Sequence, residues 1–358
     1  RRRVRTASDA NQLRNAIESA VSSLQAFVGQ DGGLASSSKA PPPKIVTQWF
    51  ESLSVGTKRP FKCPSDYNGV LHELGRRNDV KSAFLWLKLL TQSSAAKADM
   101  YSYTSVINAC SNVGDSKSAV ECFESMLAVK IRPNTVTLNA VLKAMSKSAD
   151  TPNVKTVLSF LDSFETYNCK QDVISYGSAL HACSRASDTQ TAVSLLGRMQ
   201  RRKIVANTHC WNSLIDGFGK MGDSEAVHFW LNKMKDAKLT PSTITHNSVL
   251  TAYAKTADPD AAHDWFNKMT DMKIAPSIIT YNSLLTAYAN AARLPDAQEV
   301  FEKMIKSKIK PDVITFSILI HAAANAEELS VAEIILQRMY QFDLEPNSIL
   351  YNSMLDCC

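Results

Sequence analysis

The feature that most constrains this chain is a repeat of thirty-five residues. Methionine recurs at this step, at Met199, Met234, Met269, Met304 and Met339. Proline followed by a short polar residue keeps the same step, at Pro241, Pro276, Pro311 and Pro346. A register that holds over so many cycles is typical of repeat proteins, in which each repeat buries its apolar face only by stacking on its neighbours.

Each repeat carries the pattern of two amphipathic helices. In residues 278–312, side chains of one helical face fall three or four residues apart, at Tyr281, Leu284, Leu285 and Tyr288. A second face follows at Ala297, Val300, Phe301, Met304 and Ile305. Pro295 marks the break between them, because proline is tolerated at a helix start and resisted inside a helix. The sequence therefore predicts an all-α solenoid of helical hairpins.

The register divides most of the chain into eight full repeats and the first helix of a ninth. The full repeats are residues 64–99, 100–134, 135–172, 173–207, 208–242, 243–277, 278–312 and 313–347, and the array continues to residue 358. One extra residue in the first repeat and three in the third are expected in loops near Ser94 and Asn168, where insertions cost least. Because the ninth repeat stops at Cys358 after one helix, a capping helix or a further domain beyond that residue stays open.

The residues before the array differ in composition. Residues 1–28 form a basic arm with an amphipathic helix, residues 29–43 a linker rich in Gly, Ser and Pro, and residues 44–63 a predicted capping helix. Three interpretations of the arm stay open: the remnant of an organelle transit peptide, an arm that contacts RNA or other protein subunits, and a solvated tail.

The net charge of +6 lies outside the array. Residues 1–62 contain ten Lys or Arg and four Asp or Glu, so the other residues hold thirty of each sign. Bulk charge alone therefore does not indicate a nucleic-acid ligand for the array. No apolar run reaches the length of a transmembrane helix.

The chain contains cysteines and histidines, which can bind metals or act in catalysis, but their spacing does not match a metal site or an active site. The eight cysteines include no Cys-x-x-Cys pair, and Cys110, Cys183 and Cys358 share a repeat position that is buried by periodicity. His72, His181 and His321 also share one position, with no other ligand at metal spacing. The sequence predicts no catalytic residue, no cofactor and no metal site.

Two rows of polar residues recur once per repeat and vary between repeats. The first-helix row is Asn68, Thr104, Asn139, Gly177, Asn212, Asn247, Asn282 and Ser317. The repeat-end row is Asp99, Asn134, Asp172, Asn207, Ser242, Ser277, Asp312 and Asn347. Helix capping and turns account for these residue types. They do not explain why both rows vary while their surroundings stay constant.

A third row lies late on the first helix and is never acidic. It reads Arg76, Asn112, Lys147, Arg185, Lys220, Lys255, Asn290 and Asn325. Stacked repeats would turn this row, hereafter the late-helix stripe, into a polar and partly basic surface that suits a polyanionic strand. The alternative is favourable placement of cations near helix C-termini.

With these residues in place, the chain resembles pentatricopeptide repeat proteins of the pure, thirty-five-residue class. The resemblance covers residues 64–358 and rests on the step, the Thr280-Tyr281-Asn282 start, the Ala-x-x-x-Phe-x-x-Met pattern from Ala297 to Met304, and the Ile-x-Pro-Asp close at Asp312. It implies a right-handed superhelix that binds single-stranded RNA, one base per repeat, in a chloroplast or mitochondrion.

In that family the residues of the first-helix and repeat-end rows select the base together. The resemblance implies uracil for Asn68 with Asp99, Asn139 with Asp172 and Asn282 with Asp312, and adenine for Thr104 with Asn134 and Ser317 with Asn347. It implies a pyrimidine for Asn212 with Ser242 and Asn247 with Ser277. Gly177 with Asn207 departs from the pattern because glycine has no side chain, so that base is left open. The predicted strand is U-A-U-x-Y-Y-U-A from 5′ to 3′.

The resemblance also implies apolar residues that wedge between neighbouring bases, at Val136, Ile174, Ile244, Ile279 and Ile314. Tyr101 and His209 depart from the family at this position. Phosphate contacts are expected from Arg76, Lys147, Arg185, Lys220 and Lys255 in the late-helix stripe. Two functions stay open: sequence-specific RNA binding in organellar RNA metabolism, and a structural role as a subunit of a large organellar assembly, such as a ribosome or a membrane complex.

Overall fold

The computed structural model describes residues 64–92, 98–346 and Leu350, which form two compact units divided between Ala182 and Cys183. The predicted arm (1–28), linker (29–43), capping helix (44–63) and ninth first helix lie outside the described residues. Asn347 and Cys358 lie outside them too, as does the expected insertion near Ser94.

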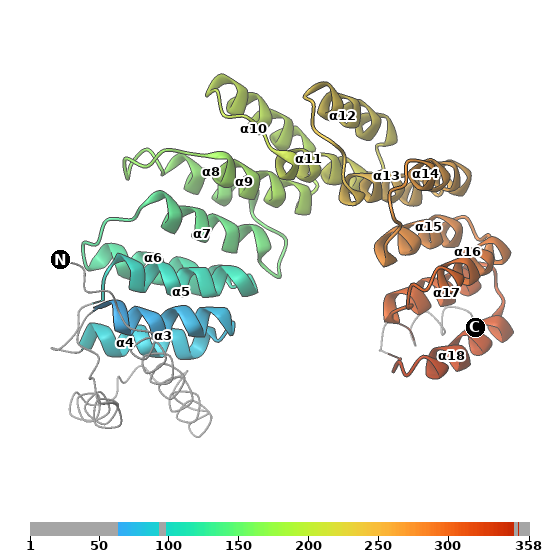
Figure 1. The fold of residues 1–358 in the computed structure, drawn as a ribbon, viewed down its shortest axis with the longest axis horizontal. Coiled ribbons are helices and arrows are strands. Elements are labelled where there is room, and N and C mark those ends of the chain that lie inside the picture. Colours follow the sequence, from blue (N-terminus) through green and yellow to red (C-terminus); the bar gives the residue numbers. More distant parts are fainter. Residues whose placement is uncertain (1–63, 93–97, 347–349, 351–358) are drawn as a thin grey trace. The chain divides into compact units, whose positions relative to one another are not determined.

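Helical hairpins build the N-terminal unit (Figure 1). Its helices are α3 (Pro64–Arg76), α4 (Val80–Gln92), α5 (Met100–Val113), α6 (Ser116–Ala128), α7 (Thr135–Lys147) and α8 (Val154–Asp162), and α9 (Val173–Arg185) crosses the boundary. The first helices α3, α5 and α7 pack in succession, while α4 and α6 each pack on their own first helix and the next one.

The C-terminal unit repeats this arrangement (Figure 1). Its helices are α10 (Thr189–Arg201), α11 (Thr208–Met221), α12 (Ser224–Asp236), α13 (Thr243–Lys255), α14 (Pro259–Asp271), α15 (Ile278–Asn290), α16 (Leu294–Lys306), α17 (Val313–Asn325) and α18 (Leu329–Gln341). The first helices α11, α13, α15 and α17 pack one on the next. Every regular element of the described residues is an α-helix, so the predicted solenoid of hairpins is confirmed.

The core consists of the side chains that recur with the repeat. Met199, Met234, Met269, Met304 and Met339 are fully buried. The predicted faces of residues 278–312 are buried as well, except that Ile305 is half-buried. Among the described residues, no helix combines the length and the hydrophobicity needed to cross a membrane.

The insertion of the third repeat lies elsewhere than predicted. Asn153 caps α8 by accepting a hydrogen bond from the Thr156 backbone N–H, 3.3 Å away. From this cap to the left-handed residue Asn168, the chain has the same length as from Asp188 to Lys203 in the next repeat. The three extra residues therefore widen the loop 148–153 between α7 and α8, and the expectation near Asn168 is wrong. The N-cap of α8 keeps the geometry of the other second helices, whereas α7 ends at its C-cap Ser148 without the left-handed residue that follows the other first helices.

Candidate functional site

The structure brings the first-helix row and the repeat-end row together within each unit. The Asn68 side-chain amide donates to the Asp99 carboxylate at 3.1 Å, and Asn139 donates to Asp172 at 3.2 Å. In the C-terminal unit, Asn212 Nδ2 lies 3.3 Å from Ser242 Oγ, and Asn282 Nδ2 lies 3.4 Å from Asp312 Oδ1.

Helix capping explains how these side chains meet. Asp99, Asn134 and Asp312 are the N-caps of α5, α7 and α17, and each accepts a hydrogen bond from the backbone of its own helix. Because first helices stack on one another, an N-cap lies beside the fifth residue of the preceding first helix. The rows therefore lie side by side at each packed pair of first helices described above, and the two side chains contact each other directly in some of these pairs and through a third side chain in others.

A third side chain, which lies outside the two rows predicted from the sequence, joins each of four sites. The residue three positions after the N-cap donates its hydroxyl to the Oδ1 of the first-helix asparagine, at 2.7–2.8 Å. These N3 residues are Ser102, Thr245, Thr280 and Thr315. The same hydroxyls contact the N-cap, so each asparagine amide is held in one orientation. The capping-box pattern was the available signal, because an N3 side chain that bonds back to the N-cap is its defining feature.

Other pairs depart from this arrangement. Thr104 donates to the Met100 carbonyl at 2.7 Å and contacts the N3 hydroxyl of Thr137 at 2.8 Å, and Thr137 in turn contacts Asn134. Asn139 Oδ1 is buried without a hydrogen-bond partner because the Ser175 hydroxyl lies 2.8 Å from the Asp172 carbonyl instead.

In the pair Asn247 and Ser277, the two side chains are bridged by a third one. Asn247 bonds Thr280, whose hydroxyl lies 3.1 Å from Ser277 Oγ. Ser317 donates to the Val313 carbonyl at 2.8 Å, and its expected partner Asn347 lies outside the described residues. Gly177 and Asn207 belong to different units, and Asn207 caps α11 through the Cys210 backbone N–H at 3.1 Å.

The predicted wedge residues form an exposed apolar row. Val136, Ile174, Ile244, Ile279 and Ile314 are each 57–63% exposed, and each is the second residue of its first helix. Tyr101 at the same position is 66% exposed, and His209 is exposed too. A β-branched residue that is exposed at the same position of several repeats does not contribute to the hydrophobic core. The row lies three residues before the first-helix row, which places both rows on one helix face.

The late-helix stripe is less uniformly cationic than the sequence indicated. Lys220 pairs with Asp216 at 2.6 Å, and Arg76 lies 3.7 Å from Glu73. Asn290 and Asn325 have a structural role, since their amides donate at 2.8 Å to the carbonyls of Ala254 and Ala289 on the preceding first helix. Lys147 and Lys255 are exposed and make no ion pair with any described residue, while Arg185 is half-buried and Asn112 exposed.

The cysteines of the described residues behave as core side chains. Cys110 and Cys183 are buried, and burial raises the pKa of each thiol to about 12. Their predicted structural role is confirmed, because such thiols stay protonated and unreactive at neutral pH. Among the described residues, no three His, Cys, Asp or Glu side chains gather as metal ligands.

Comparison with known proteins places this geometry in a family. The family model described as the pentacotripeptide-repeat region of PRORP matches residues 56–238 and 167–328, and a pentatricopeptide repeat domain matches residues 299–358. A chloroplastic pentatricopeptide repeat-containing protein of Arabidopsis thaliana is 30% identical over 30% of this chain and 22% of its own length. Another pentatricopeptide repeat-containing protein of the same plant, whose name gives no location, is 27% identical over 44% of this chain and 20% of its own length.

Solved structures agree with the fold. PPR10 in complex with an 18-nucleotide psaJ RNA element aligns with a TM-score of 0.73 at 18% identity, covering 97% of this chain and 51% of PPR10. A second structure, of PPR10 from maize, aligns with a TM-score of 0.61 at 23% identity and covers 98% of this chain. The chain thus spans about half of these solved proteins and about a fifth of the curated relatives. On the family matches, which together run from residue 56 to residue 358, the chain belongs to the pentatricopeptide repeat family.

Proposed function

We propose that this protein binds single-stranded RNA in a sequence-specific way and reads one base per repeat. The observation that carries the proposal is the meeting of the two variable rows: Asn68 with Asp99, Asn139 with Asp172, Asn212 with Ser242, and Asn282 with Asp312. A set of paired donors and acceptors, repeated once per helical hairpin, is the arrangement by which helical-repeat proteins read single bases. The presence of RNA in the complex of the similar protein PPR10 supports the same proposal.

Hydrogen-bond chemistry gives each pair a preference. The Asp312 carboxylate only accepts hydrogen bonds, and uracil offers an N–H donor between two carbonyl acceptors on its pairing edge. Asn282 Nδ2 has two N–H groups, of which Asp312 takes one, so the other can donate to a uracil carbonyl. The Asn282–Asp312 pair therefore suits uracil better than adenine. Similar reasoning applies to the Asn68–Asp99 and Asn139–Asp172 pairs.

The wedge row supplies affinity that does not depend on sequence. Ile244, Ile279 and Ile314 each extend from the start of a first helix into water. Apolar side chains between successive bases remove apolar surface from water on both base faces. The wedge row would thus hold the bases apart while the paired rows select them.

Such binding acts without catalysis. We propose that the protein sequesters a strand with the order U-A-U-x-Y-Y-U-A, and thereby protects an organellar transcript or prevents its self-pairing. A chloroplast or mitochondrial location fits the chloroplastic relatives. The protein needs no cofactor for this activity.

A structural role in an organellar assembly is the second candidate. The equal number of positive and negative residues in the array favours it, as do the Lys220–Asp216 ion pair and the structural use of Asn290 and Asn325. These features reduce the positive charge available to phosphates.

A titration separates the two candidates. Fluorescence anisotropy should show that the predicted strand binds more tightly than a scrambled strand of the same composition. Equal affinity for both strands would contradict base reading. Nuclease treatment of the native protein, followed by identification of what stays bound, tests the second candidate, because a structural subunit keeps its protein partners after the RNA is removed.

A further inference from the structure

The second helices end in an unusual residue. Seven of the described second helices are followed by a residue in the left-handed conformation, and none of the seven is glycine. Five of them are lysines, Lys130, Lys203, Lys238, Lys273 and Lys308, with φ between 57° and 60°. Glycine adopts this conformation at the least cost and is the usual residue at such helix ends. A recurrent lysine therefore accepts a conformational cost that glycine would avoid.

The first helices provide an internal comparison. Their left-handed residues are Asn78, Gly114, Ser187, Gly222, Ala257, Ala292 and Glu327. None of these is a lysine, although the helix dipole favours a cation at either kind of C-terminus. The dipole alone therefore does not explain why lysine recurs only after second helices.

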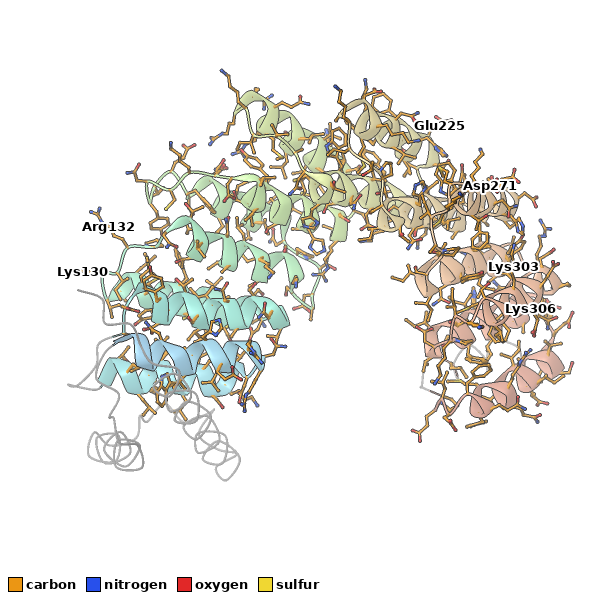
Figure 2. All side chains as sticks on the ribbon, in the orientation of Figure 1. Lys130, Arg132, Glu225, Asp271, Lys303 and Lys306 are labelled. Carbon is orange, nitrogen blue, oxygen red and sulfur yellow. The ribbon has the colours of Figure 1, made fainter. Side chains whose placement is uncertain are left out.

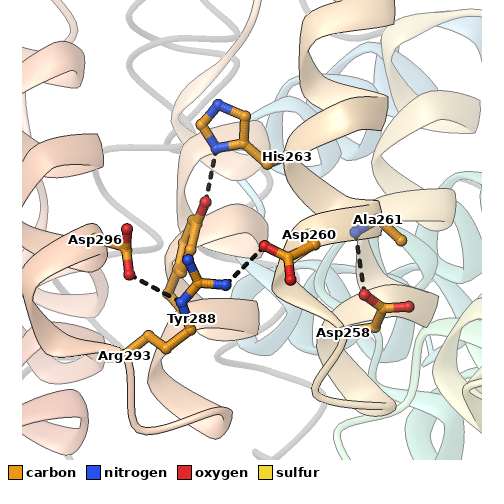
Figure 3. A network of polar contacts seen from close by, with 7 residues as sticks. All are labelled: Asp258, Asp260, Ala261, His263, Tyr288, Arg293 and Asp296. Atoms are coloured by element: carbon orange, nitrogen blue, oxygen red, sulfur yellow. Dashed lines mark hydrogen bonds and ion pairs between the residues drawn. The ribbon is translucent and has the colours of Figure 1, made fainter.

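In the C-terminal unit, positive charge gathers at the end of the hairpins where most second helices terminate, which is also the end that carries the left-handed lysines. The last turns of α10, α12, α14 and α16 with the loops that follow (198–207, 233–242, 268–277 and 303–312) contain thirteen Lys or Arg and three acidic residues, whereas the end of α18 (338–346) departs with one cation and two acidic residues. The opposite ends (186–192, 221–227, 256–262, 291–297 and 326–332) contain eight acidic residues and one cation, Arg293. That cation is compensated, since Arg293 pairs with Asp260 at 2.6 Å and Asp296 at 2.9 Å (Figure 3).

The lysines of the basic end are available to a ligand. Lys238, Lys273 and Lys308, hereafter the loop-lysine row, are exposed and form no ion pair with the described residues. Lys303 and Lys306 extend from α16 in the same part of the chain, and Lys130 and Arg132 occupy the corresponding loop of the N-terminal unit (Figure 2). Lys310 comes two residues before Asp312, so their Cα atoms are at most about 7 Å apart. The basic loops therefore adjoin the repeat-end row.

The loop lysines complement the late-helix stripe. In repeats 278–312 and 313–347 the stripe has no cation, because Asn290 and Asn325 occupy its position and bond backbone carbonyls. The end of repeat 278–312 instead carries Lys303, Lys306, Lys308 and Lys310. In repeat 278–312 positive charge thus lies at the loop and not at the stripe, whereas the end of repeat 313–347 carries Asp343 and Glu345 and no lysine.

We propose that the loop-lysine row binds the phosphate backbone of the single-stranded RNA, as a contact separate from the late-helix stripe. This inference rests on the proposed function. Its strongest support is stoichiometric, because the row supplies one left-handed lysine in each of three successive repeats (208–242, 243–277 and 278–312), and each repeat is expected to meet one nucleotide, hence one phosphate. An acidic protein segment, with side chains every 3.3–3.6 Å along an extended chain, has no such match to the repeat.

The test replaces the three lysines by the residue that their backbone conformation prefers. In the full chain, Lys238→Gly, Lys273→Gly and Lys308→Gly remove three charges and keep the left-handed turns without strain, so the melting temperature should not fall. The matched control, Lys81→Gln, Lys117→Gln and Lys155→Gln, removes three charges from exposed lysines at the starts of α4, α6 and α8. Both variants are titrated with the predicted strand at several salt concentrations.

The slope of log affinity against log salt decides the outcome. We expect the glycine variant to lose up to about 2 in this slope, at about 0.7 for each phosphate contact, while the control keeps the wild-type slope. Equal slopes for the glycine variant and wild type, or equal losses in both variants, would overturn the inference and leave the proposed function standing. If wild-type protein binds no RNA at all, the proposed function fails and this inference fails with it.

A modified strand locates the contact. When three linkages in the Y-Y-U-A segment are replaced by uncharged methylphosphonates, the wild-type slope should fall, and the glycine variant should show little further loss. If the modified strand and the glycine variant each cause a full loss of slope, and the two losses add when they are combined, the row does not contact these phosphates.

Discussion

Thr315 provides the sharpest test of how the proposed base-reading pairs are built. Its side chain is fully buried, and its hydroxyl lies 2.8 Å from Asn282 Oδ1 and 2.9 Å from Asp312 Oδ1. The hydroxyl also accepts a hydrogen bond from the Asp312 backbone N–H, at 3.3 Å. Valine has nearly the shape of threonine without the hydroxyl, so Thr315→Val removes these hydrogen bonds and leaves the packing.

The magnitude follows from the hydrogen bonds that the valine variant cannot make. One hydroxyl proton serves one acceptor at a time, so the variant loses one donated and one accepted hydrogen bond, each worth about 1 kcal/mol. Asn282 Oδ1 then lacks its partner in a half-buried place, which adds to the loss. We expect the free energy of unfolding to fall by about 2 kcal/mol. The asparagine amide would also be free to rotate, so preference for uracil over adenine at the seventh base should decrease several-fold.

Two measurements distinguish this role from ordinary core packing. Urea unfolding reports the stability, and anisotropy titrations with strands that differ only in the seventh base report the discrimination. Thr315→Ser keeps the hydroxyl and should retain the base preference of the wild type. A valine variant that loses stability but discriminates uracil from adenine as well as wild type would refute the proposed control of the amide orientation.

Other substitutions test the remaining parts of the site. Asn282→Thr with Asp312→Asn should move the preference at the seventh base from uracil to adenine, and titration of both strands would show no exchange if these residues do not read that base. Ile279→Ala should weaken binding of all strands by about 2 kcal/mol, because three carbon groups that the bases would bury are removed at about 0.8 kcal/mol each. It should change stability little, because this side chain is 60% exposed in the free protein; equal affinity would exclude the wedge role. Since burial raises the pKa of Cys110 to about 12, its neutral thiol stabilises the fold below the unfolded pKa of about 9, and this contribution is lost as pH rises toward 12. Mass spectrometry of native protein alkylated at pH 8 should find Cys169 modified before Cys110, and the reverse order would contradict that burial.

Periodicity was sufficient to predict the hairpins and their core. The repeated methionines and aromatic residues determine which helix faces are buried, and burial is what a thirty-five-residue register encodes. The meeting of the two variable rows followed from the same register, because an N-cap must lie beside the preceding first helix once first helices stack. Loop 148–153 shows the limit of this reasoning: periodicity counts extra residues but does not say which of two turns contains them.

Side-chain partners were harder to predict than positions. The sequence shows that Lys220 is basic, but its ion pair depends on Asp216, four residues earlier on the same helix face. Asn290 and Asn325 resemble ligand-binding residues in the sequence, whereas their bonds to the carbonyls of Ala254 and Ala289 depend on how closely two first helices approach. Packing determines whether such a side chain contacts solvent, a ligand or the protein itself.

The shared use of capping residues would also limit what each repeat contributes to the proposed RNA binding. Asp312 already accepts hydrogen bonds from the Thr315 backbone N–H and from Asn282 before any base arrives. A base that bonds this pair meets groups that are partly satisfied and must also give up its own hydrogen bonds to water, so the net free energy per base is small. Fixed orientation makes discrimination between bases larger than the stabilisation from any one of them, because a mismatched base would desolvate polar groups without pairing them. Specific binding by such a site therefore requires several repeats in register, which is what the stacking of first helices within each unit provides.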